Sequence, residues 1–197
     1  MQAVPNGIGW VEVVCGPMFS GKTSELIRRM ERCVYAKQEI EIFKPSLDTR
    51  YAEMEIVSHS AMRLTAKPVS CASEILQRSD PKSEVVGIDE AQFFDESLVP
   101  VVEELAAQGK RVIVAGLDQD FRGAPFEPMP QLMAIAEFVS KQLAICMKCG
   151  NPAGRSQRMI KAKSQVVLGA TDAYEARCRR CHSHEAEELP EQEELFS

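Results

Sequence analysis

The sequence lacks any long apolar run, any excess of basic residues and any regular spacing of cysteines. No segment approaches the roughly 18 apolar residues that a membrane-spanning helix needs. The first residues, MQAVPNGIGW, hold no basic segment followed by an apolar one, which predicts no secretory signal. Seven unevenly spaced cysteines do not form the pattern of a secreted disulfide framework. We therefore expect a cytoplasmic protein that makes no contact with membranes.

Acidic charge is concentrated at the C-terminus. The chain has 29 acidic and 23 basic residues, and six of the acidic ones fall in EAEELPEQEELFS, residues 185–197. The rest of the chain therefore carries 23 residues of each sign. A neutral body argues against sequence-independent binding of nucleic acid, which needs a basic face. We expect 185–197 to be an acidic, disordered tail.

Strand and helix patterns alternate along most of the chain. Strands are predicted at 10–15, 39–43, 84–89, 111–116 and 141–146, and helices at 22–37, 72–78, 95–110 and 131–139. Residues 46–70 are less regular, with one or two short strands. The alternation predicts the α/β class, with a parallel sheet flanked by helices.

Residues 16–23, GPMFSGKT, match the P-loop pattern G-x-x-x-x-G-K-[ST] between a predicted strand and a predicted helix. Its glycines permit backbone angles that point N–H groups at a phosphate, and the following helix adds the positive end of its dipole. Lys22 reaches the β- and γ-phosphates, and Thr23 offers a hydroxyl to Mg²⁺. We expect a RecA-like domain that binds ATP through Gly16, Pro17, Met18, Phe19, Ser20, Gly21, Lys22 and Thr23.

The run VVGIDE, residues 85–90, supplies two carboxylates at a predicted strand end. A P-loop protein needs a second Mg²⁺ anchor, and Asp89 stands where that anchor is usually found. Neighbouring side chains on a strand point to opposite faces, so Glu90 can face another part of the cleft and accept a proton or position a water. These residues indicate either phosphoryl transfer or nucleotide hydrolysis, and they do not decide between the two reactions.

Two C-x-x-C pairs follow, Cys146 with Cys149 and Cys178 with Cys181. In a reducing compartment, four thiolates can bind one Zn²⁺ tetrahedrally, which leaves no open position for catalysis. His182 abuts the last cysteine and is interpreted as a bystander. The remaining cysteines, Cys15, Cys33 and Cys71, lie in apolar sequence and are expected to be buried thiols. We place the P-loop domain at 1–145 and a zinc-binding domain at 146–184.

Six motifs occur in the order and spacing of one family. They are GPMFSGKT, DTR at 48–50, GIDEAQFF at 87–94, AGLDQDFRGAPF at 115–126, CMKCG at 146–150 and VVLGATDAYEARCRRC at 166–181. Together they resemble the type II thymidine kinases over residues 9–182. That family is the P-loop kind with a zinc-bound loop, or lasso, which closes over the acceptor base.

The resemblance implies an enzyme that transfers the γ-phosphate of ATP to the 5′-hydroxyl of thymidine, with deoxyuridine usually accepted. Glu90 matches the general base, and Lys22, Thr23 and Asp89 match the phosphate and Mg²⁺ residues. Asp48 and Arg50 match a loop at the phosphate end, and Gln92 is expected beside the nucleotide. Family members are usually homotetramers in which dTTP acts as feedback inhibitor in the acceptor site.

The resemblance also implies which residues contact the nucleoside and the zinc ion. Apolar contacts match Met18, Phe93, Leu117, Phe121 and Phe126; the lasso matches Val166, Val167, Leu168, Gly169 and Tyr174; and Zn²⁺ ligands match Cys146, Cys149, Cys178 and Cys181. Ser156 stands where many family members carry threonine near the thymine methyl group. Because serine lacks the methyl group of threonine, this departure argues against a strict preference for thymine over uracil.

Two other hypotheses stay open from the residues alone. The enzyme can be a kinase for another nucleoside or for a nucleotide. It can also be an ATPase whose zinc-binding part binds nucleic acid, which the basic stretch RSQRMIKAK, 155–163, favours and the neutral body disfavours.

Overall fold

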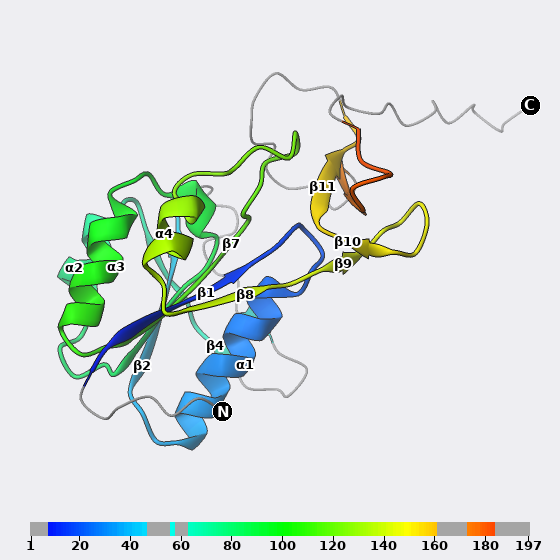
Figure 1. Cartoon of the computed structure of the whole chain (residues 1–197). Helices are drawn as coiled ribbons and strands as arrows, with labels where there is room; N and C mark the ends of the chain where they lie inside the picture. The colour runs from blue at the N-terminus through cyan, green and yellow to red at the C-terminus, as the bar shows by residue number, and fades with distance from the viewer. Residues whose placement is uncertain (1–7, 47–55, 58–62, 161–172, 184–197) are drawn as a thin grey trace, which may run out of the picture.

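The computed structural model describes residues 8–46, 56–57, 63–160 and 173–183 (Figure 1). The predicted tail, 185–197, lies outside these ranges. Within them, no helix has the length and apolar character needed to cross a membrane.

A six-stranded parallel sheet forms the body of the molecule, in the order β5-β2-β6-β7-β1-β8. Its strands are β1 (Trp10–Cys15), β2 (Ile40–Pro45), β5 (Lys67–Val69), β6 (Val85–Ile88), β7 (Arg111–Gly116) and β8 (Phe138–Lys141). The predicted α/β class is confirmed. Most residues of the four central strands are buried, as expected for parallel strands with helices on both faces.

Helices lie on both faces of the sheet (Figure 1). On one face, α1 (Lys22–Tyr35) packs Leu26, Ile27 and Met30 against alternate strand residues such as Val14 and Ile113. On the other face, α2 (Ser73–Arg78), α3 (Leu98–Ala107) and α4 (Met129–Ile135) pack against Val13, Val114 and their neighbours. The period of two along each strand therefore divides the core into two apolar layers.

The helix predicted at 131–139 is wrong in its second half. Helix α4 ends at Ile135, and Phe138–Lys141 is instead strand β8, parallel to β1 with Cys15 opposite Lys141. The local run QLMAIAEFV contains no break, so only the open edge of β1 decides where the helix stops. The strand predicted at 141–146 shrinks to β9 (Ala144–Ile145) because the chain leaves the sheet at Gln142.

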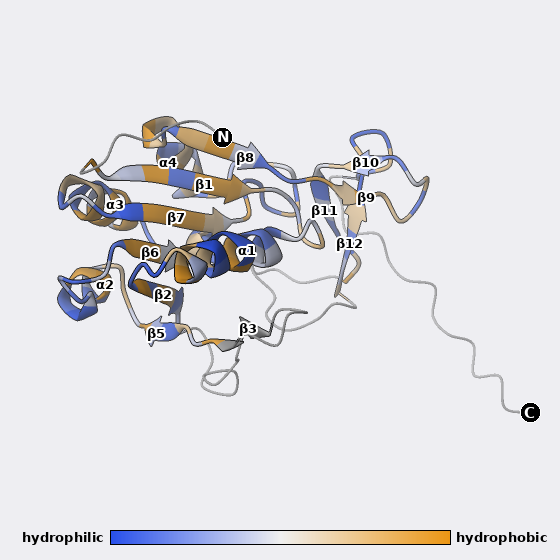
Figure 2. Cartoon of the chain, turned by 90° about the horizontal axis from the view of Figure 1, so that it is seen from below, coloured by the Kyte–Doolittle hydropathy of each residue, from blue (hydrophilic) through white to orange (hydrophobic). Residues whose placement is uncertain are grey.

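A smaller part continues from β9 and lies beyond one end of the sheet (Figure 1). It holds two antiparallel pairs, β9 with β10 (Pro152–Ala153) and β11 (Arg155–Arg158) with β12 (Tyr174–Arg177). In Figure 2 the strands of the sheet carry much hydrophobic colour, whereas β11 is hydrophilic. The described segments around residue 60 form one more short pair, β3 (Ile56–Val57) with β4 (Arg63–Leu64). The domain boundary expected at 145 stays a prediction.

Candidate functional site

The phosphate loop, residues 16–23, runs from the end of β1 into α1, as predicted. Gly16 has φ 145°, and a Cβ at this position would lie 2.3 Å from the carbonyl oxygen of Gln142. Gly21 has φ 80° at the residue before the helix. Both glycines are required by backbone geometry, and Gly16 also by the close approach of the segment that follows β8.

Lys22 and Thr23 start the helix at the loop and face two carboxylates. Lys22 Nζ donates to the carbonyl oxygen of Pro17 at 2.8 Å. Burial lowers the pKa of Lys22, against the opposing effect of the negative charges on Glu90 and Asp89. Thr23 Oγ1 lies 3.1 Å from Asp89 Oδ2. A hydroxyl beside a carboxylate is the donor set that Mg²⁺ prefers, so these residues fit the predicted metal site.

Asp89 follows directly after β6 and is almost entirely buried. Burial, together with the neighbouring charge of Glu90, raises the pKa of Asp89 to about 6. The N–H of Glu90 donates to Asp89 Oδ1 at 3.0 Å. A bound cation at this position would favour the ionised carboxylate.

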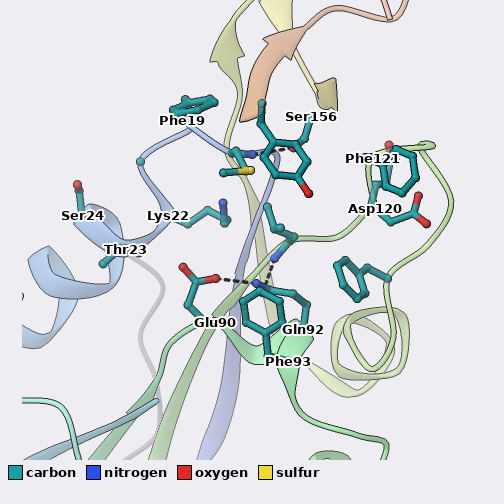
Figure 3. Close-up of a pocket in the computed structure, with 16 residues that line it drawn as sticks. Phe19, Lys22, Thr23, Ser24, Glu90, Gln92, Phe93, Asp120, Phe121 and Ser156 are labelled. Atoms are coloured by element: carbon teal, nitrogen blue, oxygen red, sulfur yellow. Dashed lines mark hydrogen bonds between the residues drawn. The ribbon is translucent and has the colours of Figure 1, made fainter. Parts of the chain in front are cut away.

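Glu90 has a left-handed backbone, with φ 53°. Gln92, in the short 3-10 helix η2 (Ala91–Phe93), donates from Nε2 to Glu90 Oε2 at 2.6 Å (Figure 3). The Gln92 Oε1 atom in turn accepts from the N–H of Leu117 at 2.9 Å. Gln92 therefore holds the Glu90 carboxylate relative to the end of β7. Sequence reasoning placed Gln92 at the nucleotide and missed this contact.

One cavity of about 370 Å³ is lined by most of the residues predicted to contact the nucleotide or the nucleoside. Its lining includes Lys22, Thr23, Glu90 and Gln92 together with the predicted nucleoside contacts Met18, Phe93, Leu117, Phe121, Phe126, Ser156 and Tyr174. Figure 3 shows Lys22, Thr23 and Glu90 on one side and Asp120 and Phe121 on the other. Groups suited to phosphates thus share a space with an apolar wall of a size that suits a small ligand.

The apolar wall is built from aromatic side chains of separate segments. Phe93, from η2, meets Phe126 edge to face with ring centroids 6.4 Å apart. From the smaller part, Ser156 Oγ accepts from the N–H of Met18 at 3.0 Å, which joins β11 to the phosphate loop. The wall therefore depends on both parts of the molecule.

Three lining residues were not predicted: Ser24, Gln119 and Asp120. Gln119 and Asp120 belong to the motif AGLDQDFRGAPF, from which only apolar residues were selected. Asp120 accepts hydrogen bonds from the backbone N–H groups of Arg122 and Ala124 and so forms a tight loop. This loop brings Gln119 and Asp120 to the cavity, which the selection of apolar residues alone did not predict. In contrast, Gly16, Pro17, Ser20 and Asp89 do not line the cavity.

Six predicted contacts lie outside the described residues. They are Asp48, Arg50, Val166, Val167, Leu168 and Gly169.

The four clustered cysteines come together as predicted. The sulfur atoms of Cys146, Cys149, Cys178 and Cys181 all lie within 4.8 Å of one another. Four thiolates at this separation fit one tetrahedral Zn²⁺. His182 instead places Nε2 2.9 Å from the carbonyl oxygen of Phe121.

The three cysteines outside the cluster differ in burial, and one of them differs from the prediction. Cys15 and Cys33 are buried, but Cys71 is exposed, so the expectation of a buried thiol is wrong there. Cys71 precedes α2 at the sheet edge, where its sulfur lies 3.1 Å from Ser73 Oγ.

The basic stretch that favoured nucleic acid is buried at residues 156–159. Ser156, Gln157 and Arg158 are 3%, 1% and 0% exposed. A buried Arg158 cannot contribute to an electrostatic face for a phosphate backbone, whereas Arg155 is half-buried.

Comparison with known proteins gives two kinds of match. A family model described as thymidine kinase matches residues 9–182. A thymidine kinase from Rhodothermus sp. (strain ITI 518) is 58% identical over 176 residues, which cover 89% of this chain and 82% of the relative.

Among solved structures, the flagellar accessory protein FlaH from Methanocaldococcus jannaschii is similar with a TM-score of 0.50. The match covers 74% of this chain and 76% of that one at 12% identity. At such low identity the likeness concerns the fold alone.

Proposed function

The chain belongs to the thymidine kinase family, and from this premise we propose that Glu90 is the general base in transfer of the γ-phosphate of ATP to the 5′-hydroxyl of thymidine. The observation that carries the proposal is the shared cavity, where Lys22, Glu90 and an aromatic wall line one space. Such a space can hold an acceptor hydroxyl beside a γ-phosphate, which is most of what phosphoryl transfer requires.

The roles of the residues follow from their contacts. The phosphate loop and Lys22 bind the β- and γ-phosphates, for which Lys22 exchanges its contact with Pro17. Thr23 and Asp89 hold Mg²⁺, which supplies charge neutralisation at the phosphate oxygens when bound. Glu90, oriented by Gln92, takes the proton from the attacking 5′-hydroxyl.

The acceptor end is assigned to the apolar wall. Phe93, Phe126 and Leu117 surround the nucleoside on one side, and Ser156 and Tyr174 approach it from the smaller part. Asp48, Arg50 and the lasso residues 166–169 are proposed to complete the site on the evidence of the motifs alone. Deoxyuridine is the expected second acceptor, and dTTP is expected to inhibit by occupying the same cavity. Inhibition by dTTP that does not compete with thymidine would contradict this assignment.

The cysteine cluster is proposed to hold a structural Zn²⁺. The site has four protein ligands and therefore no position for a water or substrate. Less than about one Zn²⁺ per chain with all thiols reduced would contradict this role.

A cytoplasmic homotetramer is the proposed form of the enzyme. Exposed apolar side chains support self-association along and beyond β8, an edge strand of the sheet: Val139, Leu143, Ile145 and Met147. Light scattering after size-exclusion chromatography gives the mass directly, and a monomer at micromolar concentration would refute this.

The decisive test is transfer of label from γ-labelled ATP to a panel of nucleosides. We expect labelled dTMP from the wild type and a loss of at least about a hundredfold in rate for Glu90→Gln. Glu103→Gln, an exposed glutamate on α3, is the matched control and should leave the rate unchanged. Label released only as inorganic phosphate would mean that the cavity serves hydrolysis.

A further inference from the structure

A fully buried arginine lies behind the cavity and has no role in the mechanism above. Arg158, the last residue of β11, is 0% exposed. It pairs in register with Tyr174 of β12 and does not itself line the cavity. Full burial of an arginine is unusual, because removing its charge from water costs free energy. Contacts with other groups must therefore compensate for that cost.

Arg158 contacts two aromatic residues that do line the cavity, Phe121 and Tyr174. Its guanidinium carbon lies 3.6 Å from the centroid of the Phe121 ring and 5.4 Å from that of Tyr174. Its Nη2 atom donates to the Tyr174 hydroxyl at 2.8 Å. A planar cation can stack on one ring and donate to another group at once, and a lysine cannot do both.

These contacts join segments that are far apart in the sequence. Phe121 comes from the loop after β7, whereas Arg158 and Tyr174 flank the chain between β11 and β12. The N–H of Met159 donates to the carbonyl oxygen of Ala173 at 2.9 Å, so the two strands stay paired one step beyond Arg158. Arg158 therefore holds the rings of Phe121 and Tyr174 at the end of the β11–β12 pair.

We propose that Arg158 is a positioning residue for the acceptor, which sets the affinity for the nucleoside by holding Phe121 and Tyr174 in place without contacting the nucleoside itself. The proposal rests on the proposed function, because it takes the cavity to be the acceptor site. It assigns Arg158 no part in ATP binding, since Phe121, on which it stacks, lies across the cavity from Lys22 and Thr23 (Figure 3). The expected signature is a change in KM for one substrate alone.

A matched control exists on the same ring. Arg122 also lies over Phe121, with its guanidinium carbon 5.5 Å from the centroid, but its side chain is 56% exposed and pairs with Asp120. A cation–π contact that stays in water contributes little compared with a buried one. Arg122→Lys and Arg158→Lys therefore make the same chemical change at an exposed and at a buried contact.

The test is steady-state kinetics of both variants, with thymidine and ATP varied in turn. Arg158→Lys is expected to raise KM for thymidine about tenfold or more, with kcat and KM for ATP within about threefold of the wild type. Arg122→Lys should stay within about threefold in all three constants. Zinc content and thermal unfolding check that each variant is folded.

Tyr174→Phe keeps the ring and removes only the hydroxyl that Arg158 contacts, so it tests the proposal if Arg158→Lys does not fold. It is expected to raise KM for thymidine about threefold, and the effects of the two substitutions should not add. Unchanged KM for thymidine in Tyr174→Phe, or a fall in kcat alone in a folded Arg158→Lys enzyme, would overturn the role. A wild type that labels no nucleoside refutes the proposed function instead, which is a different outcome.

Discussion

The sheet and the cysteine-bearing part are held together by different physics. The body buries large aliphatic side chains on both faces of the sheet, among them Leu26, Ile113 and Leu105. The buried cluster of the smaller part, as far as it is described, consists of Ala144, Cys146, Ala153, Ala176 and Cys178. Burying alanines and cysteines releases too little apolar surface to stabilise a fold, so we expect the smaller part to depend on the proposed zinc site.

Both parts nevertheless build one cavity. The body supplies the phosphate loop and Glu90, and the smaller part supplies Ser156 and Tyr174. Direct contacts join them, including the bond from the Met18 N–H to Ser156 and the stacking of Arg158 on the Phe121 ring. The groups proposed to carry the chemistry thus lie at the end of the sheet, and part of the proposed acceptor wall lies on the smaller part.

Removing the metal site should produce the largest difference between the two parts, with the smaller part unfolded and the body folded. Cys178→Ser is expected to abolish zinc binding and lower kcat/KM for thymidine at least about a thousandfold, because structural zinc contributes folding energy of about 10 kcal/mol or more. The body should stay folded. Urea unfolding followed by fluorescence of Trp10, the single tryptophan, reports on β1 in the body.

Cys71→Ser is the control for this substitution, since Cys71 is exposed and outside the cluster. It should change neither zinc content nor activity. Full activity in a zinc-free Cys178→Ser enzyme would show that the smaller part folds on apolar burial after all.

Acid should act on the body through Glu12. The Glu12 carboxylate accepts from Arg29 and Arg111 at 2.7 Å each and from the Trp10 indole at 2.8 Å. Burial would raise the pKa of Glu12, but the bonds from Arg111 and Trp10 and the charges of both arginines lower it below its ordinary value of 4.5. The stability from ionised Glu12 is therefore fully present above pH 4.5 and is lost as pH falls through the lowered pKa.

Glu12→Gln is expected to cost about 2 kcal/mol of unfolding free energy at pH 7, since charged hydrogen bonds are lost, and to flatten the decline below pH 4.5. Urea titrations read by Trp10 fluorescence at pH 7 and at pH 3.5–4.5 measure both. An equal decline in wild type and variant would place the acid sensitivity elsewhere in the body.

The smallest effect is expected at the contact that joins the parts. Ser156→Ala removes the acceptor for the Met18 N–H and should cost about 1 kcal/mol, seen as a rise of about fivefold in KM for ATP. Ser156→Thr keeps the hydroxyl and should restore ATP affinity. Equal KM values for ATP in both variants would show that the bond does not support the phosphate loop.

The strands and the phosphate loop were predictable because their signals are local. Val11, Val13 and Val14 form a buried strand from composition alone, and Gly16 and Gly21 mark backbone angles that few other residues adopt. Strand β8 was not predictable, because Phe138 and Val139 fit the preceding helix pattern equally well. Its conformation follows from pairing with β1, which is more than 100 residues away in the sequence and so leaves no local signal.

The candidate site divides in the same way. The motifs name Lys22, Asp89, Glu90 and the four cysteines because phosphate, Mg²⁺ and zinc chemistry require those residue types at fixed spacing. The contact between Gln92 and Glu90 and the burial of Arg158 against Phe121 carry no such signature. They exist because separate loops meet over the carboxyl ends of β6 and β7.

The sequence by itself determined the parallel α/β class, the phosphate loop, the cysteine cluster and the family, since each depends on residue type and spacing along the chain. Only the tertiary structure decided that β8 pairs with β1 as the edge strand, that Cys71 is exposed and that Ser156 contacts the phosphate loop. Packing between segments more than 100 residues apart, as for Met18 and Ser156, is settled by the whole fold at once.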